Sequence, residues 1–175
     1  EGYPERQERV SLKFKVRVSV RAFAPSVLAE KADDWFDLGT DRPYMLLVAD
    51  VQKDKLLEPD NDEQKKTGLE KLGVVRSRIP AVTHVDNSAR IQTVHKETNP
   101  LYHSLLKAFD SKYGCPVIVN TSFNVRGEPI VCTPADACAC FLDTEMDSLA
   151  IGPYLLHKDE QTVTGGQSKR EFMKD

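Results

Sequence analysis

The chain has 175 residues, with 24 Lys and Arg residues against 27 Asp and Glu residues, so its formal charge is −3 at pH 7. This length is enough to bury one hydrophobic core, and the slightly acidic charge argues against a protein that coats nucleic acid. No apolar run approaches the roughly 18 residues that indicate a membrane span. We therefore expect a globular domain that is not a membrane protein and does not bind nucleic acid through its overall charge.

The cysteines give no metal-binding pattern. They form no CxxC pair, and no histidine stands at zinc-ligand spacing from them, so we expect no metal site. Reduced thiols are the default in a cytoplasmic protein, which is the location we predict. The four residues are Cys115, Cys132, Cys138 and Cys140.

Composition divides the chain into three stretches. Residues 1–9 are polar without a period, which is typical of a loose entry from an upstream domain that is missing here. Residues 10–160 are predicted to form the folded domain, and residues 161–175 a flexible tail. Within the domain, residues 53–78 contain 13 charged residues in 26 and few large apolar ones. We interpret this stretch as a charged surface excursion.

The first predicted elements precede this excursion. Alternating hydrophobicity predicts a strand over residues 10–23, with two different faces. Ser26 is a candidate cap for a helix that runs through Phe36 and ends at Gly39 in a left-handed conformation. Residues 44–51 follow as a second strand.

After the excursion, the sequence predicts five further strands and two further helices. Residues 79–85 and 89–94 flank a turn and suggest a hairpin, and residues 116–119 are wholly apolar. One helix is predicted from Asn99 to just before Gly114, and another from Thr133 to about Leu142. Strands at 129–132 and 149–156 complete a pattern of strands interleaved with helices. We therefore predict an α/β (α+β) fold in which helices pack on a sheet.

A row of basic residues is the first candidate site. On a strand, Lys13, Lys15, Arg17 and Arg21 share one face at intervals of about 6.6 Å, and no acidic residue lies between positions 10 and 29. Such a row repels itself unless an anion lies across it, and phosphate suits both side chains. The alternative is a solvent-facing strand whose charges prevent edge-to-edge aggregation.

The second candidate surrounds the turn at residues 86–88. Alternation places His84 and Asp86 on one face, and the turn brings Ser88 and Arg90 near them. A purely structural histidine is the alternative. A serine hydrolase is disfavoured because the chain has no Gly-x-Ser-x-Gly elbow.

The third candidate follows the apolar strand at 116–119. Asn120, Thr121, Ser122 and Asn124 offer amides and hydroxyls that can hydrogen-bond a nucleotide at the end of a strand. A turn rich in Asn, Ser and Thr is the alternative. Neither a P-loop nor a Gly-x-Gly-x-x-Gly motif is present.

These motifs together resemble a known family. In colinear order from about Lys13 to Gly152, the chain resembles the C-terminal domain of the O-carbamoyltransferases, which include nodulation-factor, cephamycin and tobramycin carbamoyltransferases. Asn87 stands where that family usually has Gly before Ser-Ala-Arg, and Asn tolerates the left-handed conformation. Val18 and Ala22 also depart from the family, which usually has Glu and Pro there. The runs that carry the resemblance are residues 21–28, 80–86, 88–94, 120–124, 127–131 and 133–134.

The resemblance implies a YrdC-like fold, a twisted mixed parallel and antiparallel sheet that forms carbamoyl adenylate from ATP, with Mg²⁺, and carbamoyl phosphate. An N-terminal domain of the actin-like ATPase superfamily in the same full-length protein would then pass the carbamoyl group to a hydroxyl. On this basis we assign catalytic roles to Lys15, Arg17 and Arg90. Substrate or nucleotide binding is assigned to Lys13, Arg21, His84, Ser88, Asn120, Ser122 and Asn124.

Two other functions remain open at this point. The same cationic site could bind a nucleotide or RNA without turnover, and such a module would release no pyrophosphate. A threonylcarbamoyl-adenylate synthase would instead depend on threonine and bicarbonate.

Overall fold

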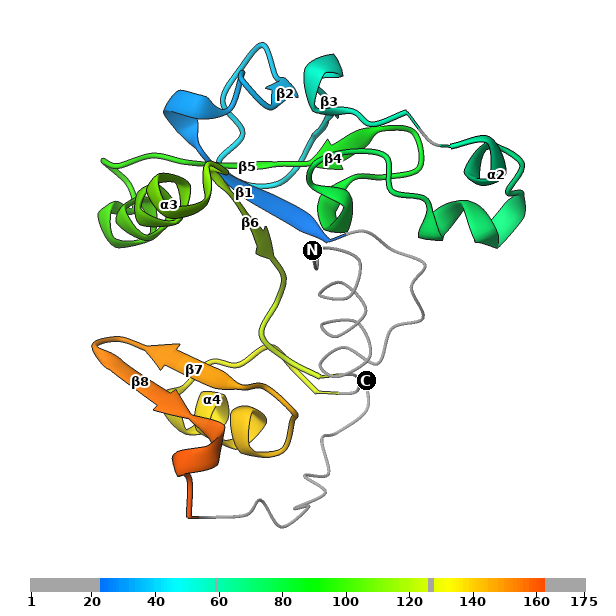
Figure 1. The fold of residues 1–175 in the computed structure, drawn as a ribbon. Coiled ribbons are helices and arrows are strands. Elements are labelled where there is room, and N and C mark those ends of the chain that lie inside the picture. The colour runs from blue at the N-terminus through cyan, green and yellow to red at the C-terminus, as the bar shows by residue number, and fades with distance from the viewer. Residues whose placement is uncertain (1–22, 59, 126–127, 163–175) are drawn as a thin grey trace. The chain divides into compact units, whose positions relative to one another are not determined.

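The structure is a computed structural model that describes residues 23–58, 60–125 and 128–162 (Figure 1). The described residues up to Thr121 form one compact unit, and those from Ser122 onward form a second. The strand predicted over residues 10–23 lies outside the described residues except for Phe23. So do Lys13, Lys15, Arg17 and Arg21, and nearly all of the predicted tail.

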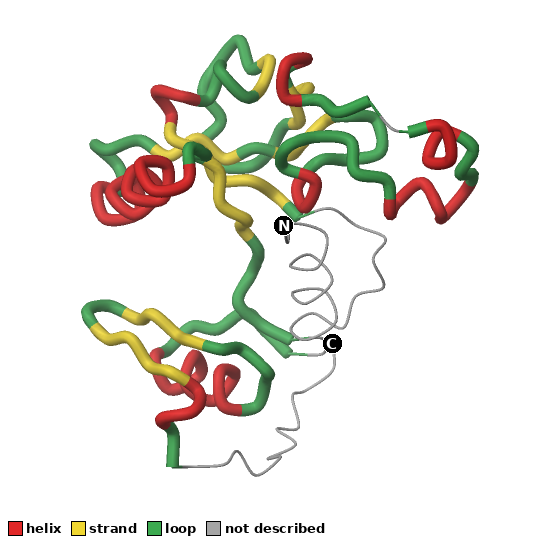
Figure 2. Tube along the Cα trace, viewed as in Figure 1, coloured by secondary structure: helices red, strands yellow, loops and turns green. Residues whose placement is uncertain are grey.

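The first unit contains a mixed sheet with β1 (Ala24–Leu28) at its centre. β5 (Gln92–Val94) pairs with β1 in parallel, and β6 (Val117–Asn120) pairs with it antiparallel. All five residues of β1 are buried, and only a short 3-10 helix, η2 (Ala29–Lys31), follows. The helix predicted from Ser26 to Phe36 is therefore wrong. Residues 24–28 form a strand (Figure 2), and the Ser26 hydroxyl donates to Gln92 on the neighbouring strand, so Ser26 does not cap a helix.

The same unit has a second sheet, in the order β2, β3, β4. β2 (Phe36–Asp37) and β4 (Ser88–Arg90) both pair antiparallel with β3 (Val48–Val51). The strand predicted over 44–51 is thus shortened to its last four residues. Met45 has a left-handed backbone, with φ 54°, which interrupts extended structure just before β3.

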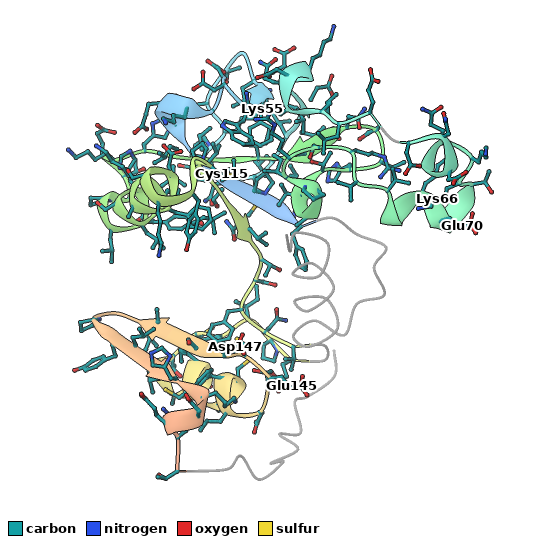
Figure 3. The ribbon with its side chains drawn as sticks, in the orientation of Figure 1. Lys55, Lys66, Glu70, Cys115, Glu145 and Asp147 are labelled. Carbon is teal, nitrogen blue, oxygen red and sulfur yellow. The ribbon has the colours of Figure 1, made fainter. Side chains whose placement is uncertain are left out.

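The charged stretch at 53–78 folds into short helical turns. These are η3 (Lys53–Lys55), α2 (Asn61–Gln64) and η4 (Gly68–Gly73). Side chains such as Glu70 reach into solvent (Figure 3). The strand predicted at 79–85 is instead η5 (Pro80–Val82). Proline at the first position of this helix lacks an N–H for a strand ladder and has the φ that a helical turn requires.

The predicted helix after Asn99 is confirmed as α3 (Pro100–Tyr113). The Asn99 side chain accepts a hydrogen bond from the Tyr102 N–H, and Gly114 ends the helix with φ 65°. Its Leu106 is fully buried and packs with Leu28 and Val94. Packing of Leu106 therefore holds α3 against the β5-β1-β6 sheet, and the caps stabilise the two ends of the helix.

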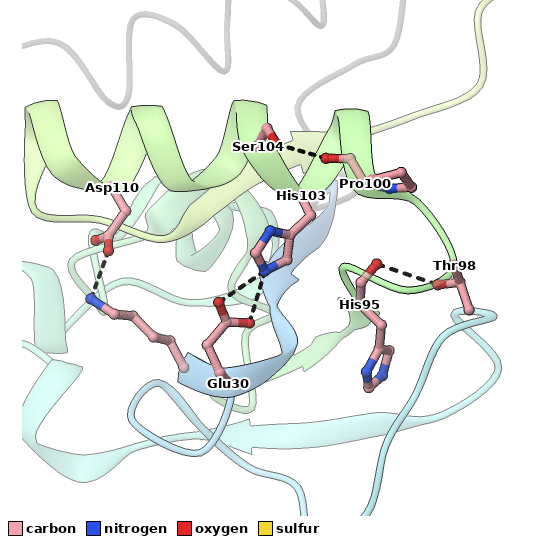
Figure 4. Close-up of polar contacts among 8 residues, drawn as sticks. Glu30, His95, Thr98, Pro100, His103, Ser104 and Asp110 are labelled. Atoms are coloured by element: carbon pink, nitrogen blue, oxygen red, sulfur yellow. Dashed lines mark hydrogen bonds and ion pairs between the residues drawn. The ribbon is translucent and has the colours of Figure 1, made fainter.

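Two polar pairs also join α3 to η2 (Figure 4). The His103 Nε2 atom lies 2.9 Å from a Glu30 carboxylate oxygen, and the Lys31 ammonium lies 2.6 Å from the Asp110 carboxylate. In each pair one side chain is largely shielded and the other is solvated: His103 is 8% exposed and Glu30 54%, and Asp110 is 14% exposed and Lys31 44%.

The second unit combines α4 (Pro134–Leu142) with a hairpin of β7 (Ser148–Ile151) and β8 (Tyr154–His157), followed by η6 (Lys158–Glu160). Ala137, Phe141 and Leu149 form its buried core. The predicted helix at 133–142 is confirmed with a complete capping box. No strand forms at 129–132, where Val131 makes a single backbone bond to Phe123.

The described residues thus form a mixed α/β structure with small mixed and antiparallel sheets. None of the helices in this part of the chain is both long and apolar enough to cross a membrane.

Candidate functional site

A row of three polar side chains crosses the β5-β1-β6 sheet. The Ser26 hydroxyl on β1 donates to the Gln92 Oε1 atom on β5 at 2.8 Å. The Asn120 Nδ2 atom, on β6, lies 3.0 Å from the Ser26 oxygen and 2.6 Å from Gln92 Oε1. Ser26 is fully buried, while Gln92 and Asn120 are partly exposed. The sheet therefore presents a fixed polar group where β6 ends.

Gln92 was not predicted as a site residue. Its Nε2 atom donates to the Pro43 carbonyl oxygen at 3.2 Å, so it joins the sheet to the segment that precedes β3. The only signal in the sequence is a long polar residue between the apolar Ile91 and the buried Thr93 and Val94. That signal could not identify its partners, which lie 66 and 28 residues away along the chain.

The predicted cluster at the turn before β4 is present in part. The Ser88 hydroxyl donates to Asp86 Oδ1 at 2.7 Å, and the Ser88 backbone N–H donates to the same oxygen at 3.1 Å. Because the hydroxyl proton is used there, the His84 Nδ1 atom, 2.9 Å from Ser88 Oγ, is the donor in that pair. These bonds to Ser88 hold the pKa of the Asp86 carboxyl below its usual value.

Asn87 shapes this turn. It has φ 64°, the left-handed conformation expected of an Asn that replaces a Gly. Its N–H donates to the His84 carbonyl, and its own carbonyl accepts from Val51 on β3. The turn is therefore fixed by backbone bonds as well as by the Ser88 side chain.

Arg90 lies at the end of β4, opposite Val48 on β3. Its side chain is exposed and makes no hydrogen bond or ion pair with the part of the chain that the structure describes. The structure thus brings His84, Asp86 and Ser88 together, and Arg90 is exposed beside them without an ion pair to any described residue.

A cavity of about 440 Å³ adjoins the same turn. Val85 and Asn87 line one part of it, and Lys53, Glu58 and Arg76 from the charged stretch line another. This volume lies within the range of small-molecule sites. The cavity walls are mixed in character, since two cations, one carboxylate and several apolar side chains contribute.

The remaining predicted residues belong to the second unit. The Ser122 hydroxyl donates to Asn124 Oδ1 at 2.8 Å, and Asn124 Nδ2 donates to the Glu128 carbonyl at 2.8 Å. These bonds stabilise a turn after β6. The loop predicted at 120–124 is therefore divided between the units, with Asn120 in the first and Ser122 and Asn124 in the second.

Metal ligands were not predicted. Among the residues that the structure describes, no three His, Cys, Asp or Glu side chains lie close enough together to hold a metal ion. Burial raises the pKa of the Cys115 thiol, which lies in the connection between α3 and β6 (Figure 3).

Comparison with known proteins places the chain in a family. The sequence model for the carbamoyltransferase C-terminus matches residues 2–158. The chain is 56% identical over 155 residues to the uncharacterized protein sll1178 of Synechocystis sp., an alignment that covers 89% of the chain and 25% of that protein. It is 39% identical over 157 residues to nodulation protein NolO of Bradyrhizobium diazoefficiens, covering 88% of the chain and 25% of NolO.

A more distant relative agrees with these two. Nodulation protein U of Sinorhizobium fredii is 30% identical over 135 residues, covering 77% of the chain and 20% of that protein. The chain thus spans about a quarter or less of the length of these relatives. The resemblance predicted from the sequence motifs is confirmed, and the chain belongs to the carbamoyltransferase C-terminal family.

Proposed function

We propose that this chain is the part of a carbamoyltransferase that forms carbamoyl adenylate, and that it adopts a YrdC-like fold. The observation that carries the proposal is the family match over residues 2–158, because this range contains all ten candidate site residues. The mixed β5-β1-β6 sheet supports the fold assignment, since a YrdC-like domain is built on a mixed sheet.

The proposed reaction uses ATP, as its Mg²⁺ complex, and carbamoyl phosphate. Water cleaves carbamoyl phosphate to carbamate and phosphate. A carbamate oxygen then bonds to the α-phosphorus of ATP, the bond from that phosphorus to the bridging oxygen breaks, and pyrophosphate leaves. The products are carbamoyl adenylate, pyrophosphate and phosphate. No covalent bond to the protein is needed, so fixed charges and positioning are what the chain must supply.

Cations of the chain would stabilise the charge that builds on the phosphates. Lys15, Arg17 and Arg90 are proposed as catalytic, with Lys13 and Arg21 in phosphate binding. The exposure of the Arg90 guanidinium supports its part in this, because no carboxylate in the described residues neutralises it. Bidentate guanidinium contacts suit phosphate oxygens.

The polar residues would bind and orient the substrates. His84 and Ser88 belong to a hydrogen-bonded turn beside a cavity of ligand size. This position favours a role in holding bound substrate. Asn120, at the end of β6, is proposed to orient the nucleotide, together with Ser122 and Asn124.

The acceptor of the carbamoyl group is proposed to bind elsewhere. The relatives are about four times as long as the aligned region, so they have room for a further domain. We expect that domain to be of the actin-like ATPase superfamily, to lie N-terminal in the same full-length protein, and to pass carbamoyl to a hydroxyl in the cytoplasm.

Pyrophosphate release tests this function. Purified protein is incubated with MgATP, with and without carbamoyl phosphate, and in parallel with threonine and bicarbonate. Release that requires carbamoyl phosphate is the expected result. Release that requires threonine and bicarbonate would instead identify a threonylcarbamoyl-adenylate synthase. Nucleotide binding without any pyrophosphate would identify a binding module.

A further inference from the structure

The orientation of the Asn120 amide can be derived from its partners, starting at Pro43. A carbonyl oxygen can only accept a hydrogen bond, so the end of the Gln92 side chain that faces Pro43 O must be Nε2, as the structure has it. The other end of that amide, the acceptor Oε1, therefore faces Ser26 and Asn120.

The direction of the next bonds follows. Gln92 Oε1 takes the single proton of the Ser26 hydroxyl, which leaves the Ser26 oxygen as an acceptor. Both acceptors, Ser26 Oγ and Gln92 Oε1, face the Asn120 side chain at 3.0 and 2.6 Å. If the Asn120 amide were turned over, its carbonyl oxygen would face another carbonyl oxygen at 2.6 Å. Its Nδ2 must therefore point inward, toward both acceptors.

This leaves one group of Asn120 for a ligand. Its Oδ1 atom receives no hydrogen bond from the described residues, and the side chain is partly exposed at the end of β6. An amide oxygen can accept a hydrogen bond but cannot donate one. A ligand group that offers only lone pairs, such as a carbonyl or a phosphate oxygen, would gain nothing there.

We propose that Asn120 determines specificity by accepting a hydrogen bond from an amino group of the substrate, and that Gln92 is the positioning residue that fixes Asn120 in this orientation. The inference rests on the proposed function and deepens it. Two substrates of that reaction carry such an N–H donor: the 6-amino group of adenine and the NH₂ of the carbamoyl group. Both offer the same chemistry to Asn120 Oδ1.

The test compares ligands that differ only in this group. In the nucleotide arm, calorimetry measures affinity for ATP and for purine riboside triphosphate, in which a hydrogen atom replaces the 6-amino group and N1 remains an acceptor. In the carbamoyl arm, it compares carbamoyl phosphate with acetyl phosphate, in which a methyl group replaces NH₂. Loss of one neutral hydrogen bond corresponds to about a five- to tenfold loss of preference.

The Asn120→Ala variant is expected to lower one of the two affinity ratios by about five- to tenfold, and the arm that responds identifies the amino group. Gln92→Met keeps the length of the side chain but removes its polar ends. We expect it to lower the same ratio at least about twofold, because the Asn120 amide can then turn over. Gln52→Met is the matched control, since the Gln52 amide also donates to backbone carbonyls of this unit but does not contact Asn120.

Hydrogen exchange of the Asn120 side-chain amide, measured by NMR, tests the positioning role of Gln92 without any ligand. In the unaltered protein, the two side-chain amide protons of Asn120 should exchange slowly with solvent. Gln92→Met should speed that exchange, and Gln52→Met should not. Circular dichroism confirms that each variant is folded.

The outcomes separate this inference from the proposed function. Binding of neither ATP nor carbamoyl phosphate by the unaltered protein would overturn both. Binding of both ligands, with the two ratios unchanged in Asn120→Ala, would overturn this inference alone. Unchanged amide exchange in Gln92→Met would overturn the positioning role of Gln92.

Discussion

Asn120 and Asn124 are four residues apart, yet the structure holds them by different means. Asn120 is bound by side chains from two other strands, one of them fully buried. Asn124 is bound by a neighbouring hydroxyl and by the Glu128 carbonyl, both within four residues of it. The orientation of Asn120 therefore depends on the tertiary fold of the first unit, whereas the bonds described for Asn124 lie within a turn of the second. The contacts of Asn120 and those of Asn124 therefore have to be tested by different experiments.

The largest expected effect comes from the core of the second unit. Phe141 is 1% exposed and packs with Ala137 and Leu149. Phe141→Ala should lower the free energy of unfolding of this unit by about 3–5 kcal/mol, through lost burial and a cavity. Urea unfolding followed by NMR signals of residues 148–157 measures the loss. Leu155→Ala, at a residue 60% exposed, is the control and should change little.

Phe141→Ala also tests whether the surroundings of Asn120 and Asn124 respond independently. The single tryptophan, Trp35, lies in the first unit, so its fluorescence reports that unit. We expect Phe141→Ala to disturb the Asn124 turn while the Trp35 transition and the Asn120 amide signals move less. An equal shift of both transitions would contradict the separation.

The next effect concerns ligand binding in the first unit. Arg90→Ala should weaken binding of ATP or carbamoyl phosphate about ten- to a hundredfold, since a charge-assisted hydrogen bond contributes roughly 1.5–3 kcal/mol. The fold should be unchanged because the Arg90 side chain contacts no described partner. Calorimetric titration measures the affinity. Arg78→Ala removes another exposed arginine of the same unit as a control, and wild-type affinity in Arg90→Ala would refute the assignment.

A smaller loss of stability is expected from removing a helix cap, and each unit has a capped α-helix. Asn99→Ala removes the cap of α3, and Thr133→Ala removes half of the capping box of α4. Each should cost about 1 kcal/mol of stability, within a range of roughly 0.5–2. Thermal and urea unfolding measure both. Asn99→Asp and Thr133→Ser keep a capping oxygen and should recover most of the loss, whereas equal losses in these variants would show that capping is not the cause.

The caps also show what the sequence could predict. Asn99, Pro100 and Gly114 mark both ends of α3, and Thr133 with Asp136 marks the start of α4. In each case the signal and its partner lie within one helical turn. The cluster of His84, Asp86 and Ser88 was predictable for the same reason, because its bonds span at most four residues. Local hydrogen bonding can be deduced from spacing.

Long-range bonding could not be deduced in this way. Ser26 has the residue type of a helix cap, but Gln92, 66 residues away, accepts from its hydroxyl within a buried strand. The strand assignment overrides the capping signal because β1 is covered by strands on both sides. Gln92 was missed as a site residue because its role depends on Pro43, Ser26 and Asn120 meeting in the folded sheet. The four basic residues from Lys13 to Arg21 lie outside the described residues, so their roles stay predictions.

The smallest expected effect is a change of pKa at the turn before β4. The hydrogen bond from the Ser88 hydroxyl is the main cause that holds the pKa of Asp86 below its ordinary value of 3.8, and the Ser88 N–H adds to it. Ser88→Ala removes the first bond and keeps the second, so the pKa of Asp86 should rise but stay below that of an unfolded chain. NMR titration of the Asp86 carboxyl carbon measures the change.

The sign of the stability effect follows from linkage. Because the pKa of Asp86 is lower in the folded protein than in the unfolded chain, its bonds stabilise the fold above about pH 4, and this contribution is lost as the pH falls through the folded pKa. The difference in unfolding free energy between the unaltered protein and Ser88→Ala should therefore shrink as the pH falls below about 5. The reason is that an unperturbed aspartate has a pKa of about 3.9 and folded Asp86 has a lower one. Ser148→Ala is the control, since that hydroxyl contacts His157 and not a carboxylate. A difference that stays constant with pH would mean that Ser88 acts only through packing, and the local turn would then owe its rigidity to Asn87 and the backbone bonds around it.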